Sequence, residues 1–151
     1  MTINQLRAQA RRLKAEKKIE LLIVDYLQLI KGTKSENRDQ EIGTISRGLK
    51  GIAKELKIPV LTLCQLSRKA DEGGKPQLSW LRESGNIESD ADVVIFIISQ
   101  QKKKEEQVYG EAIANTKELH IVKNRNGPSG VVELVWIPEY TAFKNAAHEE
   151  T

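Results

Sequence analysis

The chain has 151 residues, of which 39% are hydrophobic and 30% charged, and its formal net charge is +3. This length fits one domain with a sizeable core, and so mild a charge permits contact with nucleic acid without requiring it. The single cysteine, Cys64, excludes an intramolecular disulfide and suits a reducing compartment. No apolar run approaches about 18 residues, so we expect no membrane span and a cytoplasmic protein.

The first expected element is an amphipathic helix over residues 3–17. Its apolar side chains recur on one face, and basic side chains cover the rest. The two sets are Ile3, Leu6, Ala10 and Leu13, and Arg7, Arg11, Arg12 and Lys14.

An apolar run that ends in Asp25 predicts a first buried strand, which with its exit spans residues 20–30. A second helix is expected to begin near Asn37, whose side chain caps it while Gln40 reaches back. It stops before Ile58-Pro59, because a residue that precedes proline resists helical backbone angles. The core face of this helix is Ile42, Ile45, Leu49, Ile52, Ala53 and Leu56.

Residues 60–64 predict a second buried strand, with Cys64 in the core. Strand, helix and strand over residues 20–64 form a βαβ unit, so the two strands should be parallel. Asp25 and Gln65 each follow one of these strands and should therefore share the carboxyl edge of the sheet. Ligands of open α/β sheets bind at that edge.

The second half of the chain predicts mainly strands. A run of turn-forming residues, Asn126-Gly127-Pro128-Ser129-Gly130, lies between two β-rich segments and predicts a hairpin. The expected elements are a loop over 67–78, a short helix over 79–88, a strand over 93–98, an exposed loop over 100–116, strands over 118–123 and 131–137, and a last strand over 142–144.

Four short segments together resemble the bacterial replicative DNA helicases of the DnaB type, with their RecA-like motor domain. The segments are residues 22–30 (LIVDYLQLI), 64–68 (CQLSR), 81–85 (LRESG) and 123–130 (KNRNGPSG). The resemblance implies an α/β fold, a partial RecA-like domain whose mostly parallel sheet is flanked by helices and followed by a C-terminal β-hairpin. Residues 1–145 are then the C-terminal part of the ATPase domain, and 146–151 a frayed tail.

The resemblance implies that Asp25 acts through Mg²⁺, since a carboxylate at a strand end can hold metal-bound water while the metal bridges the phosphates of ATP. It implies that Gln65 senses the γ-phosphate, because an amide offers both a donor and an acceptor. The plainer alternatives are an Asp that satisfies a turn and a polar residue that closes a strand.

Arg82, Glu83 and Gly85 match the family's inward-facing DNA loop, which tracks the backbone of single-stranded DNA. The alternative is a solvated helix start with an internal Arg–Glu pair. Trp80, just before the motif, is expected to be a partly buried aromatic rather than a surface on which bases stack.

Arg125 resembles the arginine finger of the family, and Lys123 its companion. Both lie at the start of the predicted hairpin, a rigid mount from which to reach across a subunit interface. By pattern alone, the same two residues read as charges that alternate on an exposed strand.

No G-x-x-x-x-G-K-[ST] phosphate loop occurs in the 151 residues. We expect the family's phosphate loop and catalytic glutamate to lie upstream of this chain, which alone should neither bind ATP tightly nor hydrolyse it. The family's sheet has the phosphate-loop strand between strands 60–64 and 93–98. Without that strand we expect an open or repacked sheet, or pairing with another chain.

The resemblance thus implies the C-terminal part of a 5′-to-3′ DNA helicase. In the assembled homohexamer it uses ATP and Mg²⁺ on single-stranded DNA, with primase and a helicase loader as further partners. One alternative is a non-enzymatic module that binds DNA or docks onto a full-length helicase. Another is a fragment of a different RecA-like ATPase, against which residues 81–85 and 123–130 argue.

Overall fold

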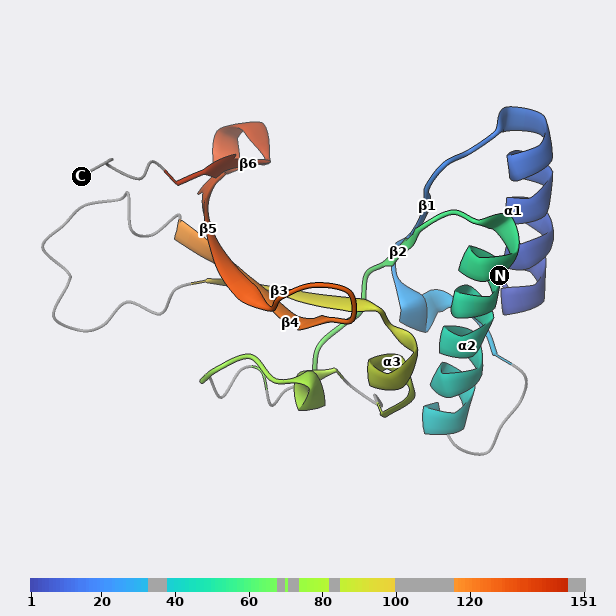
Figure 1. Ribbon diagram of the computed structural model, residues 1–151, viewed down its shortest axis with the longest axis horizontal. Helices are drawn as coiled ribbons and strands as arrows, with labels where there is room; N and C mark the ends of the chain where they lie inside the picture. Colours follow the sequence, from blue (N-terminus) through green and yellow to red (C-terminus); the bar gives the residue numbers. More distant parts are fainter. Residues whose placement is uncertain (33–37, 68–69, 71–73, 82–84, 100–115, 147–151) are drawn as a thin grey trace, which may run out of the picture. The chain divides into compact units, whose positions relative to one another are not determined.

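The computed structural model describes residues 1–32, 38–67, 70, 74–81, 85–99 and 116–146. The chain divides into two compact units, Met1–Ala91 and Asp92–Thr151. The first contains a two-stranded sheet with its helices, and the second a four-stranded sheet (Figure 1).

Helix α1 spans Ile3–Lys17, as predicted. A capping box starts it: the Thr2 hydroxyl accepts from the Gln5 N–H at 3.2 Å, and the Gln5 side chain accepts from the Thr2 N–H at 2.8 Å. The helix ends at Lys18, whose φ of 51° is left-handed. Of the predicted apolar face Leu13 is exposed, and only the residues nearer the N-terminus are buried.

Helix α2 spans Arg38–Leu56 and supplies the centre of the first unit's core. Its side chains Ile42, Ile45 and Ile52 are the largest fully buried ones among the described residues. The predicted end before Ile58-Pro59 is confirmed. The predicted cap, Asn37, lies outside the described residues.

Strands β1 (Leu22–Val24) and β2 (Val60–Thr62) are parallel, with Ile23 opposite Leu61. The predicted βαβ unit is therefore confirmed. Both strands are shorter than expected, and after β1 the chain turns into the 3₁₀ helix η1 (Leu27–Leu29).

The expectation that these two strands are buried is wrong for one of their faces. Ile23 is 57% exposed and Leu61 54%, and Leu21 and Leu63 on the same face are exposed too. Within the described part of the chain the sheet has only these two strands. Cys64, predicted to be core, is half-buried.

The rest of the first unit is short. The helix expected over residues 79–88 is replaced by the 3₁₀ helix η3 (Leu78–Trp80) and helix α3 (Gly85–Asp90), with residues 82–84 between them outside the described part. Trp80 is buried, which agrees with the predicted packing role. Arg47 of α2 donates to the Asn86 side chain at 3.2 Å and links α2 to α3.

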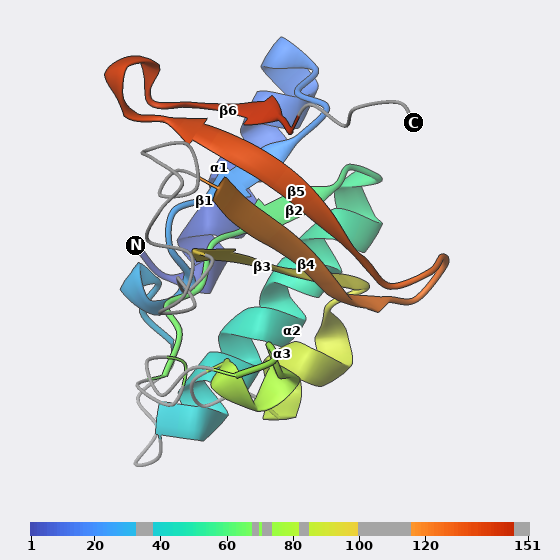
Figure 2. The ribbon, with the colours of Figure 1, turned by 90° about the vertical axis from the view of Figure 1, so that its left-hand side faces the viewer.

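The second unit is a meander of four antiparallel strands in the order β3-β4-β5-β6 (Figure 2). The predicted strands and the hairpin are confirmed; in the turn, the Asn124 side chain donates to the Pro128 carbonyl at 3.1 Å. The strands are β3 (Val93–Ser99), β4 (Thr116–Asn124), β5 (Gly130–Ile137) and β6 (Ala142–Asn145), with the 3₁₀ helix η5 (Pro138–Tyr140) before the last.

The α/β class is confirmed, but parallel pairing among the described residues is confined to β1 and β2. The pairs β3–β4, β4–β5 and β5–β6 are all antiparallel. Among the described residues β2 and β3 belong to different sheets, and the open or repacked sheet stays a prediction. Of the predicted tail, residues 147–151 lie outside the described part.

Candidate functional site

Asp25 and Gln65 share the carboxyl edge of the β1–β2 pair. Asp25 directly follows β1 and Gln65 lies three residues beyond β2, and the parallel register sets Val24 opposite Thr62. Both side chains are exposed. The chain therefore presents a carboxylate and an amide at one sheet edge, as the βαβ pattern predicts.

An open hollow of about 290 Å³ lies at this edge. It is lined by Tyr26, Leu63, Cys64 and Gln65. Tyr26 follows Asp25 through a cis peptide bond. The hollow is thus built from the segments that follow both strands.

Gln28 ties these two segments together through its side-chain amide. Its Nε2 donates to the Gln65 carbonyl at 3.3 Å and to Cys64 Sγ at 3.2 Å, and its Oε1 accepts from the Gln65 N–H at 3.3 Å. Backbone bonds just before this point join the same segments: Leu63 N–H to the Val24 carbonyl at 3.0 Å, and Leu27 N–H to the Leu63 carbonyl at 2.9 Å.

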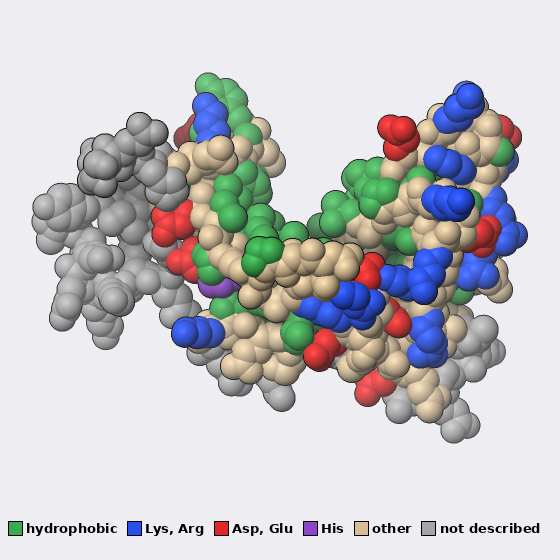
Figure 3. Space-filling model, in the orientation of Figure 1, with side chains coloured by type: hydrophobic (Ala, Val, Ile, Leu, Met, Phe, Trp, Pro, Cys, Tyr) green, Lys and Arg blue, Asp and Glu red, His purple; other side chains and the backbone are tan. Residues whose placement is uncertain are grey.

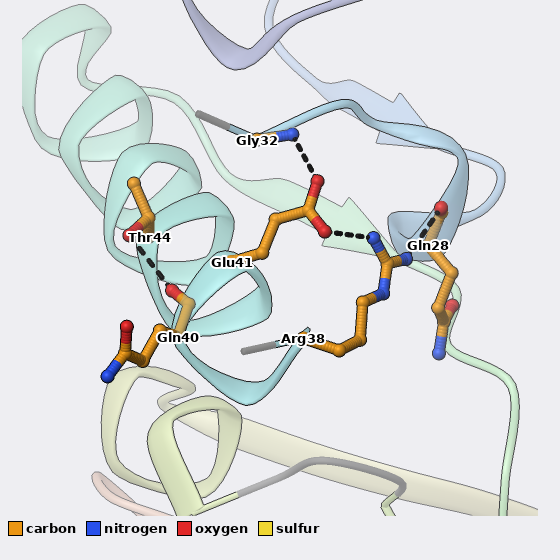
Figure 4. A network of polar contacts seen from close by, with 6 residues as sticks. All are labelled: Gln28, Gly32, Arg38, Gln40, Glu41 and Thr44. Carbon is orange, nitrogen blue, oxygen red and sulfur yellow. Dashed lines mark hydrogen bonds and ion pairs between the residues drawn. The ribbon is translucent and has the colours of Figure 1, made fainter. Parts of the chain in front are cut away.

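A second group of polar contacts joins the start of α2 to the segment after β1 (Figure 4). Arg38 donates to the Gln28 carbonyl at 3.1 Å and forms an ion pair with Glu41. Glu41 also accepts from the Gly32 N–H at 2.8 Å. The hydrogen bond from Arg38, and then that from Gly32, hold the pKa of the Glu41 carboxyl below its usual value.

In the second unit, Arg125 follows β4 and is anchored to Asp92 at two points. Its guanidinium lies 3.1 Å from Asp92 Oδ1, and its backbone N–H donates to the Asp92 carbonyl at 2.8 Å. The side chain is still 48% exposed, so it lies at the surface and not in the interior. Lys123, two residues earlier, is half-buried within β4 opposite Val94.

The residues of the predicted DNA loop are described only in part. Arg82 and Glu83 lie outside the described residues, and Gly85 is the exposed first residue of α3. Asp25 and Gln65 lie in the first unit, Lys123 and Arg125 in the second.

Asp25 suits a hard divalent cation, because Mg²⁺ takes oxygen ligands and is commonly held by one or two carboxylates with phosphates and water. The described residues contain no group of three or more His, Cys, Asp and Glu that could hold a metal ion by themselves. Across the same residues, no helix has the length and apolar character to cross a membrane.

A model of the family described as "DnaB-like helicase C terminal domain" matches residues 1–145. The chain belongs to the DnaB-like helicase C-terminal domain family. This membership confirms the resemblance carried by the four short segments.

Curated relatives in this family include replicative DNA helicases. The chain is 45% identical over 161 residues to the replicative DNA helicase DnaB of Rickettsia prowazekii (strain Madrid E), covering 96% of this chain and 33% of the relative. It is 43% identical over 147 residues to that of Geobacillus stearothermophilus, covering 95% of this chain and 32% of the relative. The chain thus spans about one third of the length of these relatives.

Two solved structures share the fold of the chain. One is described as "The Structure Of A DnaB-Like Replicative Helicase And Its Interactions With Primase", with a TM-score of 0.80, 35% identity and coverage of 97% of this chain and 35% of that one. The other is described as an ATPase domain, with the same TM-score and identity and coverage of 97% of this chain and 52% of that one. The expected fold, part of a RecA-like ATPase domain, is confirmed.

Sequence reasoning assigned no role to Gln28, Arg38, Glu41 or Asp92. Gln28 lies within the segment that carries the resemblance, but only a fold reveals that its amide reaches Gln65, 37 residues away. Asp92 precedes a strand and carries no pattern that points to Arg125. Of these four, only Glu41 had a signal in the sequence: it is an acid in the first turn of a helix, where a carboxylate is favoured close to backbone N–H groups.

Proposed function

We propose that this chain forms the C-terminal part of the ATP-hydrolysing motor of a replicative DNA helicase. In an assembled homohexamer, that motor would unwind duplex DNA in the 5′-to-3′ direction. The observation that carries the proposal is the placement of Asp25 and Gln65 after two parallel strands, at the same edge of their sheet, in a chain that belongs to the DnaB-like family.

At this edge, Asp25 would hold Mg²⁺ and Gln65 would sense the γ-phosphate of ATP. When bound, the cation neutralises the charge that spreads over the phosphate oxygens. Asp25 is suited to this role because its carboxylate is exposed at the strand end. Gln65 is suited to sensing because its amide can donate to phosphate and accept from water.

Arg125 serves the ATP of a neighbouring subunit as an arginine finger, with Lys123 beside it. The backbone N–H and the side chain of Arg125 both bind Asp92, and the guanidinium is still exposed. The guanidinium is therefore a pre-oriented donor, which supports this role. Such a finger contributes on the order of 10³–10⁵ in rate.

The loop that carries Arg82, Glu83 and Gly85 tracks the phosphate backbone of single-stranded DNA. Backbone N–H groups and one arginine are enough for this contact, since a helicase must ignore sequence. The support is the match of this segment to the family's DNA loop.

The chain works with other polypeptide, and primase and a helicase loader are further partners in the cytoplasm. Exposed apolar side chains on both sheets support association (Figure 3). They include Ile23, Leu61 and Leu63 in the first unit and Ile95, Ile97 and Val132 in the second. The isolated chain is inactive, since it has no phosphate loop to grip the nucleotide.

The test is an ATPase assay with radioactive ATP on two proteins. One is the chain alone; the other is a chimeric helicase in which the chain replaces the matching third of the Geobacillus stearothermophilus relative. We expect no turnover by the chain, turnover by the chimera, and loss of that turnover in Asp25→Asn. Turnover by the chain alone that Asp25→Asn abolishes, or a hexameric chimera without activity, would refute the proposal.

The second candidate function is a non-enzymatic module that docks onto a full-length helicase, favoured by the same exposed apolar side chains. Under this reading the chain binds the intact Geobacillus helicase, while the hexameric chimera hydrolyses no ATP. The assay therefore separates the two functions.

A further inference from the structure

We infer that Gln28 is a positioning residue that holds Gln65 in place at the sheet edge. The inference rests on the proposed sensing role of Gln65. It concerns how that residue is kept where it can act, and it assigns Gln28 no contact with nucleotide.

The Gln28 side chain takes the place that a strand backbone would occupy. Along the second strand, the backbone N–H and carbonyl groups of alternate residues point toward β1. The Pro59 carbonyl accepts from Leu22, and both backbone groups of Leu63 bind β1 and the residues that follow it. Gln65 is next in this alternation, but β1 has already ended. The side-chain amide of Gln28 bonds both the N–H and the carbonyl of Gln65, and so adds one more rung to the parallel ladder.

The orientation of this amide is fixed by its partners. The Gln65 N–H requires an acceptor, so Oε1 faces it, while the two hydrogens on Nε2 serve the Gln65 carbonyl and Cys64 Sγ. The reverse orientation would set donor against donor and acceptor against acceptor. Only glutamine offers both groups at this length and without charge.

Gln28 is itself held from behind. Its carbonyl accepts from Arg38, which forms an ion pair with Glu41, and Glu41 accepts from the Gly32 N–H (Figure 4). Hydrogen bonds therefore run without a break from the first turn of α2 to the backbone of Gln65. A residue fixed at both ends can impose a position on its neighbour.

The segment after Gln65 is fixed as well. Leu66 forms a bridge with Leu81, and the Ser67 N–H donates to the Trp80 carbonyl at 2.8 Å. Gln28 holds the backbone of Gln65, and this bridge holds the residues that follow it. The part of Gln65 that can still change conformation is therefore chiefly its side chain. A sensor needs this, because a misplacement of about 1 Å can cost on the order of 10²-fold in rate.

The first test measures amide hydrogen exchange by NMR in the full 151-residue chain. Gln28→Met removes both hydrogen bonds of the side chain to the Gln65 backbone, and Gln28→Glu keeps an acceptor for the Gln65 N–H. Gln77→Met is the matched control at an exposed glutamine. We expect the Gln65 amide to exchange about tenfold faster or more in Gln28→Met, to keep part of its protection in Gln28→Glu, and to be unchanged in the control.

The Leu63 amide reports whether the sheet itself survives, since its bond to Val24 does not involve Gln28. The inference is overturned if Gln65 exchanges equally fast in the original chain and in Gln28→Met while Leu63 stays protected. If Gln28→Met does not fold, Gln28→Glu decides: a Gln65 amide that keeps part or all of its protection supports the acceptor role, and one with no protection overturns it.

The second test measures kcat and KM of the chimeric helicase. We expect Gln28→Met to lower kcat about tenfold while KM stays within about twofold, because positioning acts on the reacting geometry and not on uniform binding. An unchanged kcat in a variant that has lost the Gln65 protection overturns the positioning role. An inactive chimera refutes the proposed function instead, and the exchange result still decides whether Gln28 holds Gln65.

Discussion

The two units of the chain hide their apolar side chains to very different degrees. Met1–Ala91 has a closed core around α2, with Ile42, Ile45 and Ile52 fully buried. In Asp92–Thr151 the buried apolar side chains among the described residues are Val94 and Phe96 alone. The first unit thus has a buried apolar core, while the described part of the second unit leaves most of its apolar side chains accessible to solvent.

The difference follows from how helices and sheets bury surface. An amphipathic helix needs one partner, and α1 and α2 supply each other with one. A meander is held by its ladders and by cross-strand pairs such as Trp136 and Phe143, whose ring centroids lie 4.7 Å apart. A sheet buries an apolar face only against another layer, and among the described residues of the second unit Ile95 and Ile97 stay exposed.

The largest expected effect comes from cutting into the closed core. Ile45→Ala should lower the free energy of unfolding by about 2–5 kcal/mol, because the side chain is 0% exposed and its loss leaves a cavity. Ile97→Ala, at a position that is 55% exposed, should change it by no more than about 0.5 kcal/mol. Urea unfolding of the whole chain measures both. Equal losses would show that the second unit is as closed as the first.

A smaller effect is expected where the two helices approach each other. An alanine Cβ at Gly48 would lie 2.4 Å from Ile3 Cγ1, and Ile3 is buried. Gly48→Ala should therefore destabilise the chain by about 1–3 kcal/mol, through overpacking. Gly51, three residues later, is the matched control.

At Gly51 the nearest atom to an added Cβ is the flexible end of Arg7, at 3.3 Å. Gly51→Ala should stabilise by about 0.5–1 kcal/mol, the usual gain in a helix. Thermal unfolding compares the two. The same sign for both substitutions would contradict close packing of α1 on α2.

The smallest expected effect is a pH dependence at the start of α2. The folded-state pKa of Glu41 is depressed by Arg38 and then by Gly32, so its contribution to stability is present above the unfolded-state pKa and is lost as pH falls through the folded one. Glu41→Gln should therefore be less stable than the original chain at pH 7, by about 1 kcal/mol or less.

That difference should shrink as the pH is lowered below about 4.5, the ordinary value for glutamate. Chemical unfolding across this range measures it. Glu20→Gln, at an exposed position outside the contacts of Glu41, serves as the control. A difference that grows in acid would contradict the depressed pKa.

The elements with a strong local signal could be predicted from the sequence. The apolar period of α2, the proline after Ile58 and the turn residues after Asn124 are local, and each predicted its element. The exposed face of β1 and β2 could not be predicted, because an apolar run reads the same whether or not a further layer covers it. The contact between Gln28 and Gln65 escaped too, since a side chain bonded to a distant backbone leaves no periodic trace.

A direct measurement of the shared site mixes two inactive forms of the chimeric helicase. Asp25→Asn removes the acid from one subunit, and Arg125→Ala removes the finger from another; each alone should abolish ATP hydrolysis. When the two are mixed and reassembled, we expect activity to return, because the intact Asp25 of one subunit then meets the intact Arg125 of its neighbour. Mixtures that form hexamers yet stay as inactive as either parent would show that these residues do not serve one nucleotide across an interface.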